Sequence, residues 1–446
     1  MYTCGPTVYA IPHIGNYRSF IVADVIRRYL EFLGYKVKHV MNITDIDDKT
    51  IRDSAKEGLS LKEFTRKYEK FFFDGLKILN IKKAFKYPRA TEHVKDMIKI
   101  VRALIRKGYA YVASDGVYYS ISKFKDYGKL SGIDLSKIKV GVRVSVDEYA
   151  KESPQDFALM KKSTTEEIKR GIYYSTEWGK MRPGWHIECS AMSMKYLGKT
   201  FDIHTGGIDL IFPHHENEIA QSEAYTGKKF VNYWLHNEYL FVNGQKMSKS
   251  LGNIITIYDV IKKYDPEVLR YAYLSTHYRD RLNYTEEFMA NAKRNYEKLK
   301  ETFDNLNFML KHTKFKKEKD EEFLEKLKKI KEEFVSAMDD DFNTVLALRV
   351  FHKLAKEINK YIRKERGKNE LTAALKLFNQ FAEILGLKFK KTEEIIPADV
   401  KDLVQKREEA RKKGDWEVAD KIREKIKELG YMIEDTPAGP RIKKIK

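Results

Sequence analysis

The first part of the chain alternates short apolar runs with one longer amphipathic segment. Residues 1–5 and 37–42 are rich in β-forming side chains. Residues 19–33 repeat apolar side chains near helical spacing and are followed by Gly34, which ends helices. A strand, a helix and a second strand in this order form a parallel βαβ unit. We therefore predict an α/β core of the kind that binds nucleotides.

The pattern changes after residue 85 and later returns. Within residues 85–174 a helical segment precedes residues 109–122, where Ser114-Asp-Gly116 separates two β-rich runs as a hairpin turn does. The α/β pattern resumes at residues 201–204, which run into Gly206-Gly207 and then Asp209. The chain is therefore predicted to leave the core, form an inserted module and come back.

The remainder is predominantly helical. Residues 311–333 form a mixed Lys/Glu run, and apolar side chains from Val345 to Ile358 recur at helical spacing, which predicts a helical bundle. After Pro397 the apolar spacing predicts two short helices and a basic tail at residues 441–446.

The charge balance favours a polyanionic partner. The chain has 85 Lys and Arg against 65 Asp and Glu, a net charge of +20, and phosphate neutralisation by such a surface favours RNA. A charged surface of a heat-adapted organism would explain the charge content but not its sign. The chain has no apolar stretch long enough to cross a membrane and no secretory leader, so we expect a cytoplasmic protein.

Two short motifs predict a split ATP site. His13 and Gly15 fall between the first strand and its helix, where backbone N–H groups and the helix dipole attract phosphate. Lys246-Met-Ser-Lys-Ser250 contains two lysines that could close over a triphosphate and neutralise departing pyrophosphate. Neither a Walker sequence nor a G-x-G-x-x-G fingerprint is present. Each motif alone would be an ordinary turn or solvated loop.

The two cysteines suggest a metal site. His214 and Glu218 are four residues apart and face one way if a helix begins there, and Cys189 and Cys4 could join them as zinc ligands. The alternative is that both cysteines are small buried hydrophobic residues. Five of the 11 histidines lie between His186 and His236, which favours a functional cleft.

These segments together closely resemble cysteinyl-tRNA synthetase, a class I aminoacyl-tRNA synthetase, along the whole chain. Residues 1–9 with His13-Ile-Gly15 resemble the first ATP motif of that family, and residues 246–250 resemble its second. Gly184-Trp-His-Ile-Glu-Cys189 and Phe212-Pro-His-His-Glu-Asn-Glu218 resemble its zinc segments. The resemblance implies a Rossmann-type catalytic core with an inserted connective domain, an all-α helical bundle and a small C-terminal anticodon-binding module.

The resemblance also implies site residues. One Zn²⁺ per chain would be bound by Cys4, Cys189, His214 and Glu218. Thr44 and Trp185 match amino-acid pocket positions, although a strand-end threonine and a core tryptophan are the ordinary alternatives. The implied ATP-binding residues, of which His13, Lys246 and Lys249 would be catalytic, are Pro6, Thr7, His13, Gly15, Asn16, Gly206, Gly207, Asp209, Lys246 and Lys249. Asp209 could instead cap a helix.

The implied reaction activates L-cysteine with Mg²⁺-ATP as cysteinyl-adenylate and transfers it to tRNA(Cys). Zinc would distinguish the thiolate of cysteine from the hydroxyl of serine. One anticodon region per chain favours a monomer. Asp341-Phe-Asn-Thr344 and Leu346-Ala-Leu-Arg349 resemble the anticodon-side bundle of the family, and residues 430–437 its last RNA-reading module.

The predicted domain boundaries follow from the patterns and the resemblance. Residues 1–85 and 175–245 are the two halves of the catalytic domain, and residues 86–174 are the inserted connective domain. Residues 246–303 hold the second ATP motif and a stem-contact helical region. Residues 304–395 are the helical bundle, and residues 396–446 are the anticodon-binding module.

The chain departs from the family pattern in three ways, and two alternative functions stay open. The chain begins three residues before Cys4, which suggests a truncated or misassigned start, Asn16 replaces a common second histidine, and Pro440-Arg441-Ile442 lacks an aromatic residue. One alternative is a cysteine ligase that uses an amino-sugar acceptor in thiol biosynthesis. The other is a non-catalytic RNA-binding relative.

Overall fold

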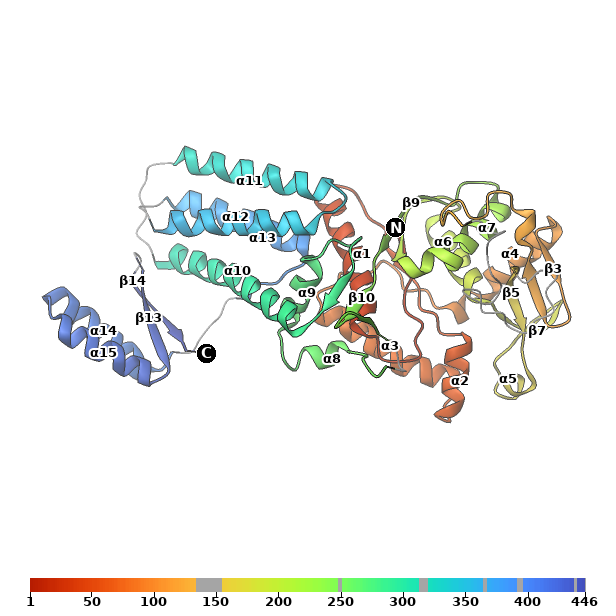
Figure 1. The fold of residues 1–446 in the computed structure, drawn as a ribbon, viewed down its shortest axis with the longest axis horizontal. Coiled ribbons are helices and arrows are strands. Elements are labelled where there is room, and N and C mark those ends of the chain that lie inside the picture. Colours follow the sequence, from red (N-terminus) through yellow and green to blue (C-terminus); the bar gives the residue numbers. More distant parts are fainter. Residues whose placement is uncertain are drawn as a thin grey trace. The chain divides into compact units, whose positions relative to one another are not determined.

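The structure is a computed structural model that describes residues 1–133, 155–247, 251–312, 320–363, 367–390, 396–436 and 439–445. The chain divides into two compact units, Met1–Ala292 and Lys293–Lys446 (Figure 1). The domain boundaries drawn above remain predictions.

A parallel four-stranded sheet forms the centre of the first unit. Its strand order is β2-β1-β8-β9, and every neighbouring pair is parallel. The strands are β1 (Tyr2–Thr3), β2 (Val40–Met41), β8 (Phe201–Gly207) and β9 (Val231–Asn237). The predicted βαβ unit is confirmed, and so is the return of the chain, because β1 from the start of the sequence pairs directly with β8.

Helix α1 (Ile14–Phe32) connects β1 to β2 and begins earlier than the predicted residue 19. The side chain of His13 accepts a hydrogen bond from the backbone N–H of Asn16, and the side-chain oxygen of Asn16 accepts one from the N–H of His13. This reciprocal cap satisfies two backbone donors and fixes the first turn. Apolar periodicity does not detect a start that is set by polar side chains.

The inserted module contains the predicted hairpin. β3 and β4 pair antiparallel on either side of Ser114-Asp-Gly116 and belong to a five-stranded sheet of order β3-β4-β5-β7-β6. Helix α4 packs on α6 and α7, which return to the core. The remaining described elements between β2 and β9, inside and outside the inserted module, are α2 (Asp48–Lys56), α3 (Leu61–Ile78), η1 (Ala90–Glu92), α4 (Val94–Arg106), β3 (Ala110–Val112), β4 (Gly116–Tyr119), η2 (Ile121–Lys123), β5 (Phe157–Lys162), α5 (Thr165–Lys169), β6 (Tyr174–Thr176), β7 (Gly179–Pro183), α6 (Trp185–Leu197), η4 (Ile208–Leu210), η5 (Ile211–His215) and α7 (Glu216–Thr226).

A small three-stranded sheet follows β9 and carries Lys246, the first residue of the second predicted ATP motif. Its order is β11-β10-β12, in which β10 pairs antiparallel with β11 and parallel with β12. The elements here are β10 (Leu240–Val242), β11 (Gln245–Lys246), α8 (Ile257–Val260), α9 (Pro266–Leu274) and β12 (Leu282–Tyr284).

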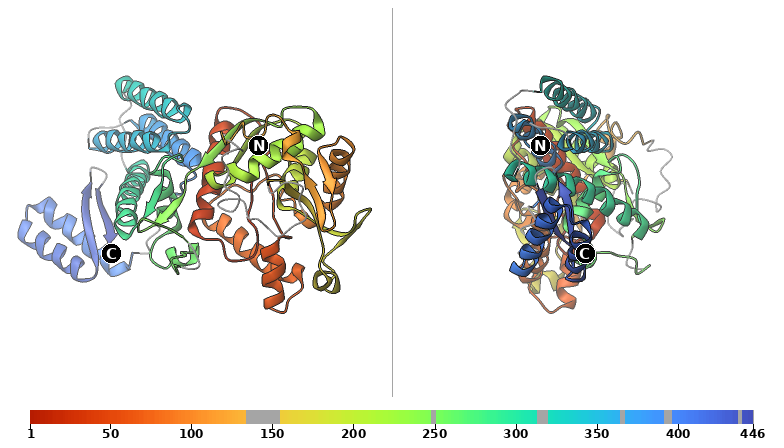
Figure 2. Two further views of the ribbon diagram at one scale, coloured as in Figure 1. Left: turned by 45° about the vertical axis from the view of Figure 1, so that its right-hand side comes forward. Right: turned by 90° about the vertical axis from the view of Figure 1, so that its left-hand side faces the viewer.

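The second unit contains the predicted helical bundle. Helices α11, α12 and α13 lie side by side (Figures 1 and 2), and the rings of Phe334 and Phe381 stack in their core with centroids 3.8 Å apart. The elements of the bundle are α10 (Glu286–His312), which begins in the first unit, α11 (Glu321–Asp339), α12 (Thr344–Ile362) and α13 (Lys368–Leu385).

The C-terminal segment corrects one prediction. The two helices are present as α14 (Ala398–Lys413) and α15 (Trp416–Glu428), but residues 441–446 were expected to form a basic tail. Instead β13 (Tyr431–Thr436) pairs antiparallel with β14 (Gly439–Lys444). The hairpin buries Ile433 against α14 and α15. Its apolar side chains are consecutive at Tyr431, Met432 and Ile433 and isolated at Ile442, so hydrophobic alternation could not reveal it.

None of the described helices is long and apolar enough to cross a membrane.

A buried carboxylate anchors α1 and provides a test of the fold. Asp24 accepts hydrogen bonds from Arg28 at 2.7 Å and from Arg270 of α9 at 2.6 Å. Burial opposes its ionisation, but the charges of Arg270 and Arg28 outweigh this and lower the pKa of Asp24. The resulting stabilisation is present above the ordinary carboxyl pKa and is lost as the pH falls through the lower pKa of the folded state.

We expect Asp24→Asn to lower the free energy of unfolding by about 3 kcal/mol at neutral pH, because two buried guanidinium groups lose their anion. The midpoint of the first urea transition measures this. Glu31→Gln on the same helix removes more exposed ion pairs with Arg27 and Lys82 and should cost about 1 kcal/mol or less. Equal effects of the two substitutions would contradict this assignment.

Candidate active site

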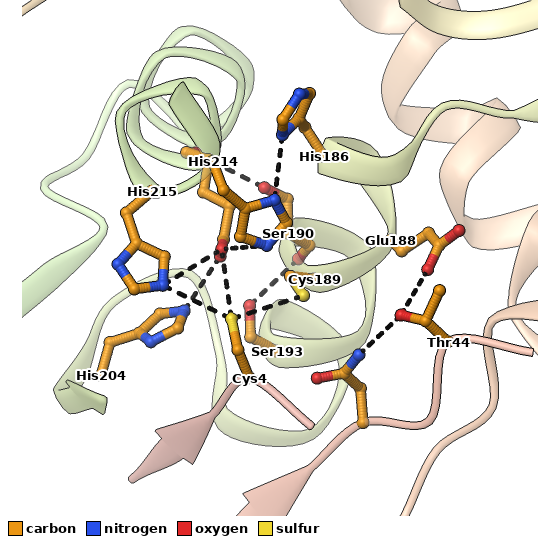
Figure 3. A network of polar contacts seen from close by, with 12 residues as sticks. Cys4, Thr44, His186, Glu188, Cys189, Ser190, Ser193, His204, His214 and His215 are labelled. Atoms are coloured by element: carbon orange, nitrogen blue, oxygen red, sulfur yellow. Dashed lines mark hydrogen bonds and ion pairs between the residues drawn. The ribbon is translucent and has the colours of Figure 1, made fainter. Parts of the chain in front are cut away.

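Cys4, Cys189, His214 and Glu218 converge at one end of the parallel sheet (Figure 3). Cys4 directly follows β1, Cys189 lies in α6, and the other two lie on either side of the junction of η5 and α7. All four are buried, and one donor atom from each lies within 4.8 Å of the others. The two sulfur atoms are 3.9 Å apart, and Nε2 of His214 lies 3.1 Å from Oε1 of Glu218. Two thiols, an imidazole and a carboxylate are a chemically suitable zinc set.

A second set of donors overlaps the first. Cys4 and Glu218 also lie within 4.8 Å of donor atoms of His204 and His215. His204 Nε2 is 3.0 Å from Oε2 of Glu218, and His215 Nε2 is 3.4 Å from the sulfur of Cys4. Neither histidine was predicted as a site residue from the sequence. The concentration of histidines between residues 186 and 236 was the only signal for them.

Burial and neighbouring charges shift the ionisation of this cluster. Burial raises the pKa of Cys4 well above its ordinary value, with hydrogen bonding to Cys189 acting in the same direction. Burial opposes ionisation of Cys189 too, but its hydrogen bond with Cys4 and the charge of His214 lower the pKa of that thiol to about 6. Glu218 is likewise buried, yet His204 and His214 lower its pKa to about 2. Burial opposes protonation of His214, but Cys189 and Glu218 raise its pKa to about 10, so Cys189 and Glu218 are anionic while Cys4 and His214 hold protons that a bound metal ion would displace.

The two predicted amino-acid pocket residues lie beside this cluster. The ring of Trp185 stacks on that of His214 with centroids 4.2 Å apart and is 38% exposed, so it is not an ordinary core tryptophan. The hydroxyl of Thr44 is buried and donates to Oε2 of Glu188 at 3.0 Å, while the amide of Asn42 donates to the same hydroxyl. Thr44 is therefore held by side chains, and Glu188 is a further buried carboxyl group that the sequence analysis missed.

The structure brings the two ATP motifs together. A Cβ atom on Gly15 would lie 2.9 Å from the terminal methyl of Met247, so the side chain of Met247 covers this glycine. After the second motif, the carbonyl of Ile255 accepts a hydrogen bond from Ile14 N–H at 2.9 Å, and Thr256 forms an antiparallel bridge with His13. Segments far apart in the sequence thus meet at the first turn of α1.

The other predicted ATP residues lie on the connection that precedes α1 and at the end of β8. Pro6 and Thr7 lie between Cys4 and His13, where Thr7 forms a parallel bridge with Thr44. Gly206 and Gly207 are the last residues of β8. Asp209 lies within η4, whose N-cap is Gly207, so the alternative role of Asp209 as an N-cap does not hold. Burial lowers the pKa of His13, and the negative charge of Asp209 partly offsets this.

The lysines of the second motif are described in part. Lys246 is at the end of β11, and its ammonium lies 4.2 Å from the centroid of the Tyr239 ring. Lys249 lies outside the described residues.

Family models match most of the chain. Residues 1–294 match the catalytic domain of class I (C) tRNA synthetases, residues 333–390 match the DALR domain, and residues 394–440 match the cysteinyl-tRNA ligase anticodon binding domain. The first match alone covers more than half of the chain.

Curated relatives and solved structures agree with these matches. The chain is 54% identical to a cysteine–tRNA ligase of Methanosarcina mazei and 48% identical to one of Thermococcus onnurineus, covering 100% of this chain and 94% of each relative. A Mycobacterium tuberculosis methionyl-tRNA synthetase bound by methionyl-adenylate is 15% identical with a TM-score of 0.62, over 86% of this chain and 89% of that chain. A LeuRS of Agrobacterium radiobacter K84 in a ternary complex is 11% identical with a TM-score of 0.65, over 86% of this chain and 84% of that chain. The structural matches establish the class I synthetase fold, and the sequence matches establish that the chain belongs to the cysteinyl-tRNA ligase family.

Proposed function

We propose that this protein joins L-cysteine to tRNA(Cys) in an ATP-dependent reaction through cysteinyl-adenylate. The observation that carries the proposal is that Cys4, which belongs to the buried cluster of thiols, imidazole and carboxylate, lies on the same β1–α1 connection as His13. One short segment therefore carries both a residue proposed to help recognise a thiol, Cys4, and a residue proposed to bind phosphate, His13.

The cluster of Cys4, Cys189, His214 and Glu218 supports one bound Zn²⁺ per chain. When bound, the ion would offer a coordination position that favours the thiolate of cysteine over the hydroxyl of serine. His204 holds the second oxygen of Glu218, which fixes the direction of the first oxygen. Trp185 covers His214, so the side of the cluster next to the proposed pocket is apolar.

The proposed amino-acid pocket has Thr44 and Trp185 on its walls. Because Thr44 is fixed by Glu188 and Asn42, its position relative to the cluster does not depend on the substrate. Such preorganisation reduces the entropic cost of orienting the cysteine carboxylate toward the α-phosphate of ATP.

The first turn of α1 supports the phosphate site. His13 would donate to a phosphate oxygen, and Gly15 has no side chain to obstruct an adenine ring that takes the place of the Met247 side chain. Lys246 and Lys249 would neutralise departing pyrophosphate, and Mg²⁺ would arrive with ATP. Asn16, whose backbone N–H and side-chain oxygen are both engaged in the helix cap, would contribute the N–H groups of its side-chain amide.

The acceptor is proposed to be tRNA rather than an amino sugar. The match of residues 394–440 to an anticodon-binding domain and the net charge of +20 both favour this acceptor. Monomeric state and a cytoplasmic location remain predictions from the sequence.

We expect the purified protein to charge a tRNA(Cys) transcript with labelled cysteine and not with serine. Lys246→Ala should lower the rate of cysteine-dependent pyrophosphate exchange by about two orders of magnitude, because one preorganised cation is lost. Lys262→Ala, which removes an exposed ion pair with Asp259, should leave the rate unchanged. Exchange without charging would favour the amino-sugar ligase, and the absence of both would favour a non-catalytic RNA-binding relative.

The two overlapping donor sets allow a direct test of the metal position. Zinc content measured by plasma mass spectrometry should fall from one ion per chain to near zero in His214→Ala. His204→Ala should retain the ion with roughly 10- to 100-fold weaker affinity, because only the support of Glu218 is lost. The reverse outcome would place the ion between Cys4, His204, His215 and Glu218 instead.

A hollow in the C-terminal module supports contact with single-stranded RNA. Its volume is about 340 Å³, and Arg411, Trp416 and Asp435 contribute to its lining. The ring of Trp416 is 62% exposed, and the guanidinium of Arg411 lies 6.0 Å from the ring centroid. An exposed aromatic ring next to a cation can stack an unpaired base. We therefore propose that Trp416 stacks a base of the anticodon loop.

Trp416→Ala should weaken tRNA binding by roughly 10-fold or more, because base stacking contributes about 1–3 kcal/mol. The KM for tRNA in aminoacylation should rise, while cysteine-dependent pyrophosphate exchange without tRNA stays unchanged. Leu429→Ala changes another exposed apolar side chain of the same module and is the matched control. Equal tRNA affinity of the two variants would exclude stacking at Trp416.

A further inference from the structure

Arg18 is a charged side chain in an unusual environment. It lies in the second turn of α1 and is only 1% exposed. In the part of the chain that the structure describes, its guanidinium donates to main-chain carbonyl oxygens of two separate segments. These are Glu238 and Tyr239 at 2.7 Å each, His277 at 3.0 Å, Tyr278 at 3.5 Å and Asp280 at 2.6 Å.

The two segments that Arg18 binds lead into the small sheet. Residues 238–239 precede β10, and residues 277–280 precede β12, which pairs with β10. β10 also pairs with β11, where Phe241 lies opposite Lys246. Because Arg18 and His13 belong to the first two turns of one helix, Arg18 connects the phosphate end of α1 to the sheet that carries Lys246.

Tyr239 completes the connection between Arg18 and Lys246. Its carbonyl is bound by Arg18, and its half-buried ring lies under the exposed ammonium of Lys246 with a centroid distance of 4.2 Å. A cation over a ring face is attracted by the ring quadrupole, so this contact restricts a long side chain that would otherwise move freely. The hydrogen bond from Arg18 to the Tyr239 carbonyl holds the stretch of backbone from which this ring extends.

Fold stability alone is a poor explanation for Arg18. Burial lowers the pKa of its guanidinium to about 10, which indicates that desolvation of the charge is costly. Well-packed apolar residues often replace buried charges without loss of stability. The guanidinium group of Arg18, however, donates hydrogen bonds to two segments at once and so fixes their relative position, which an apolar side chain cannot do.

We propose that Arg18 and Tyr239 are positioning residues that hold Lys246 at the His13 end of α1, where it can meet the phosphates of ATP. This inference rests on the proposed function, because it assigns Lys246 to the adenylation step. Neither residue touches the cysteine and histidine cluster in the contacts described above. Loss of the arrangement should therefore affect the rate of the step and not the affinity for cysteine.

Tyr239 allows a test that does not depend on a change in a buried charge. Tyr239→Leu removes the ring and should lower kcat for cysteine-dependent pyrophosphate exchange roughly fivefold, with KM for cysteine unchanged. Tyr239→Phe keeps the ring and should restore the rate. Tyr173→Leu removes a comparable ring under Lys180, at 4.5 Å, and is the matched control without an expected effect. A rate of Tyr239→Leu that equals or exceeds that of the unchanged protein would overturn the proposal.

A double-mutant cycle identifies the route of the effect. In a Lys246→Ala background, Tyr239→Leu should cause no further loss of rate, because the side chain that it positions is absent. An equal fivefold loss in both backgrounds would overturn the proposal and assign Tyr239 a general structural role. Arg18→Lys, which can donate at most three hydrogen bonds, should also lower kcat less in the Lys246→Ala background.

The same experiment separates this inference from the proposed function. If the unchanged protein catalyses exchange and Tyr239→Leu catalyses it at the same rate or faster, only the positioning role fails. If the unchanged protein catalyses no cysteine-dependent exchange, the proposed function fails and the positioning role with it.

Discussion

The pairing of β1 with β8 is the constraint on which the site depends. β1 has only two residues, and Thr3 is fixed by its register with Thr205 and by a hydrogen bond between the two hydroxyl groups at 2.8 Å. The next N–H, that of Cys4, donates to the Thr205 carbonyl at 3.2 Å. This pairing places the thiol of Cys4 next to the cluster that α6 and α7 supply, and it leads the chain into the first turn of α1. Parallel strands end at the same edge of a sheet, so both halves of the site form at that edge.

Burial of the histidine cluster and of Glu218 carries an electrostatic cost. His204, His214, His215 and Glu218 are all buried, and burial opposes the charged form of each titratable group. Glu218 offsets part of this cost because each of its two oxygens accepts a hydrogen bond from a histidine. A cation bound among the donors would offset the rest of this cost, which is a physical argument for the proposed metal site.

The parts of the fold with regular hydrophobic periods could be predicted from the sequence. The βαβ unit, the hairpin of the inserted module and the helical bundle followed from apolar spacing, and Cys4, Cys189, His214 and Glu218 were grouped before their distances were known. Their roles remain proposals. His204 and His215 were missed because their partners come from other elements, and no local spacing indicates such contacts. Arg18 was missed because it precedes the predicted start of its helix at residue 19 and its partners are more than 200 residues away in the chain. The β13–β14 hairpin was missed because its apolar side chains do not alternate with polar ones.

X-ray absorption at the zinc edge tests the central claim most directly, because it counts the atoms bound to the ion with and without substrate. The account predicts two sulfur ligands in the protein alone, and one additional sulfur ligand after addition of cysteine but not of serine. A protein that binds no zinc, or a sulfur count that does not change with cysteine, would contradict the claim that this cluster recognises the substrate through its thiolate.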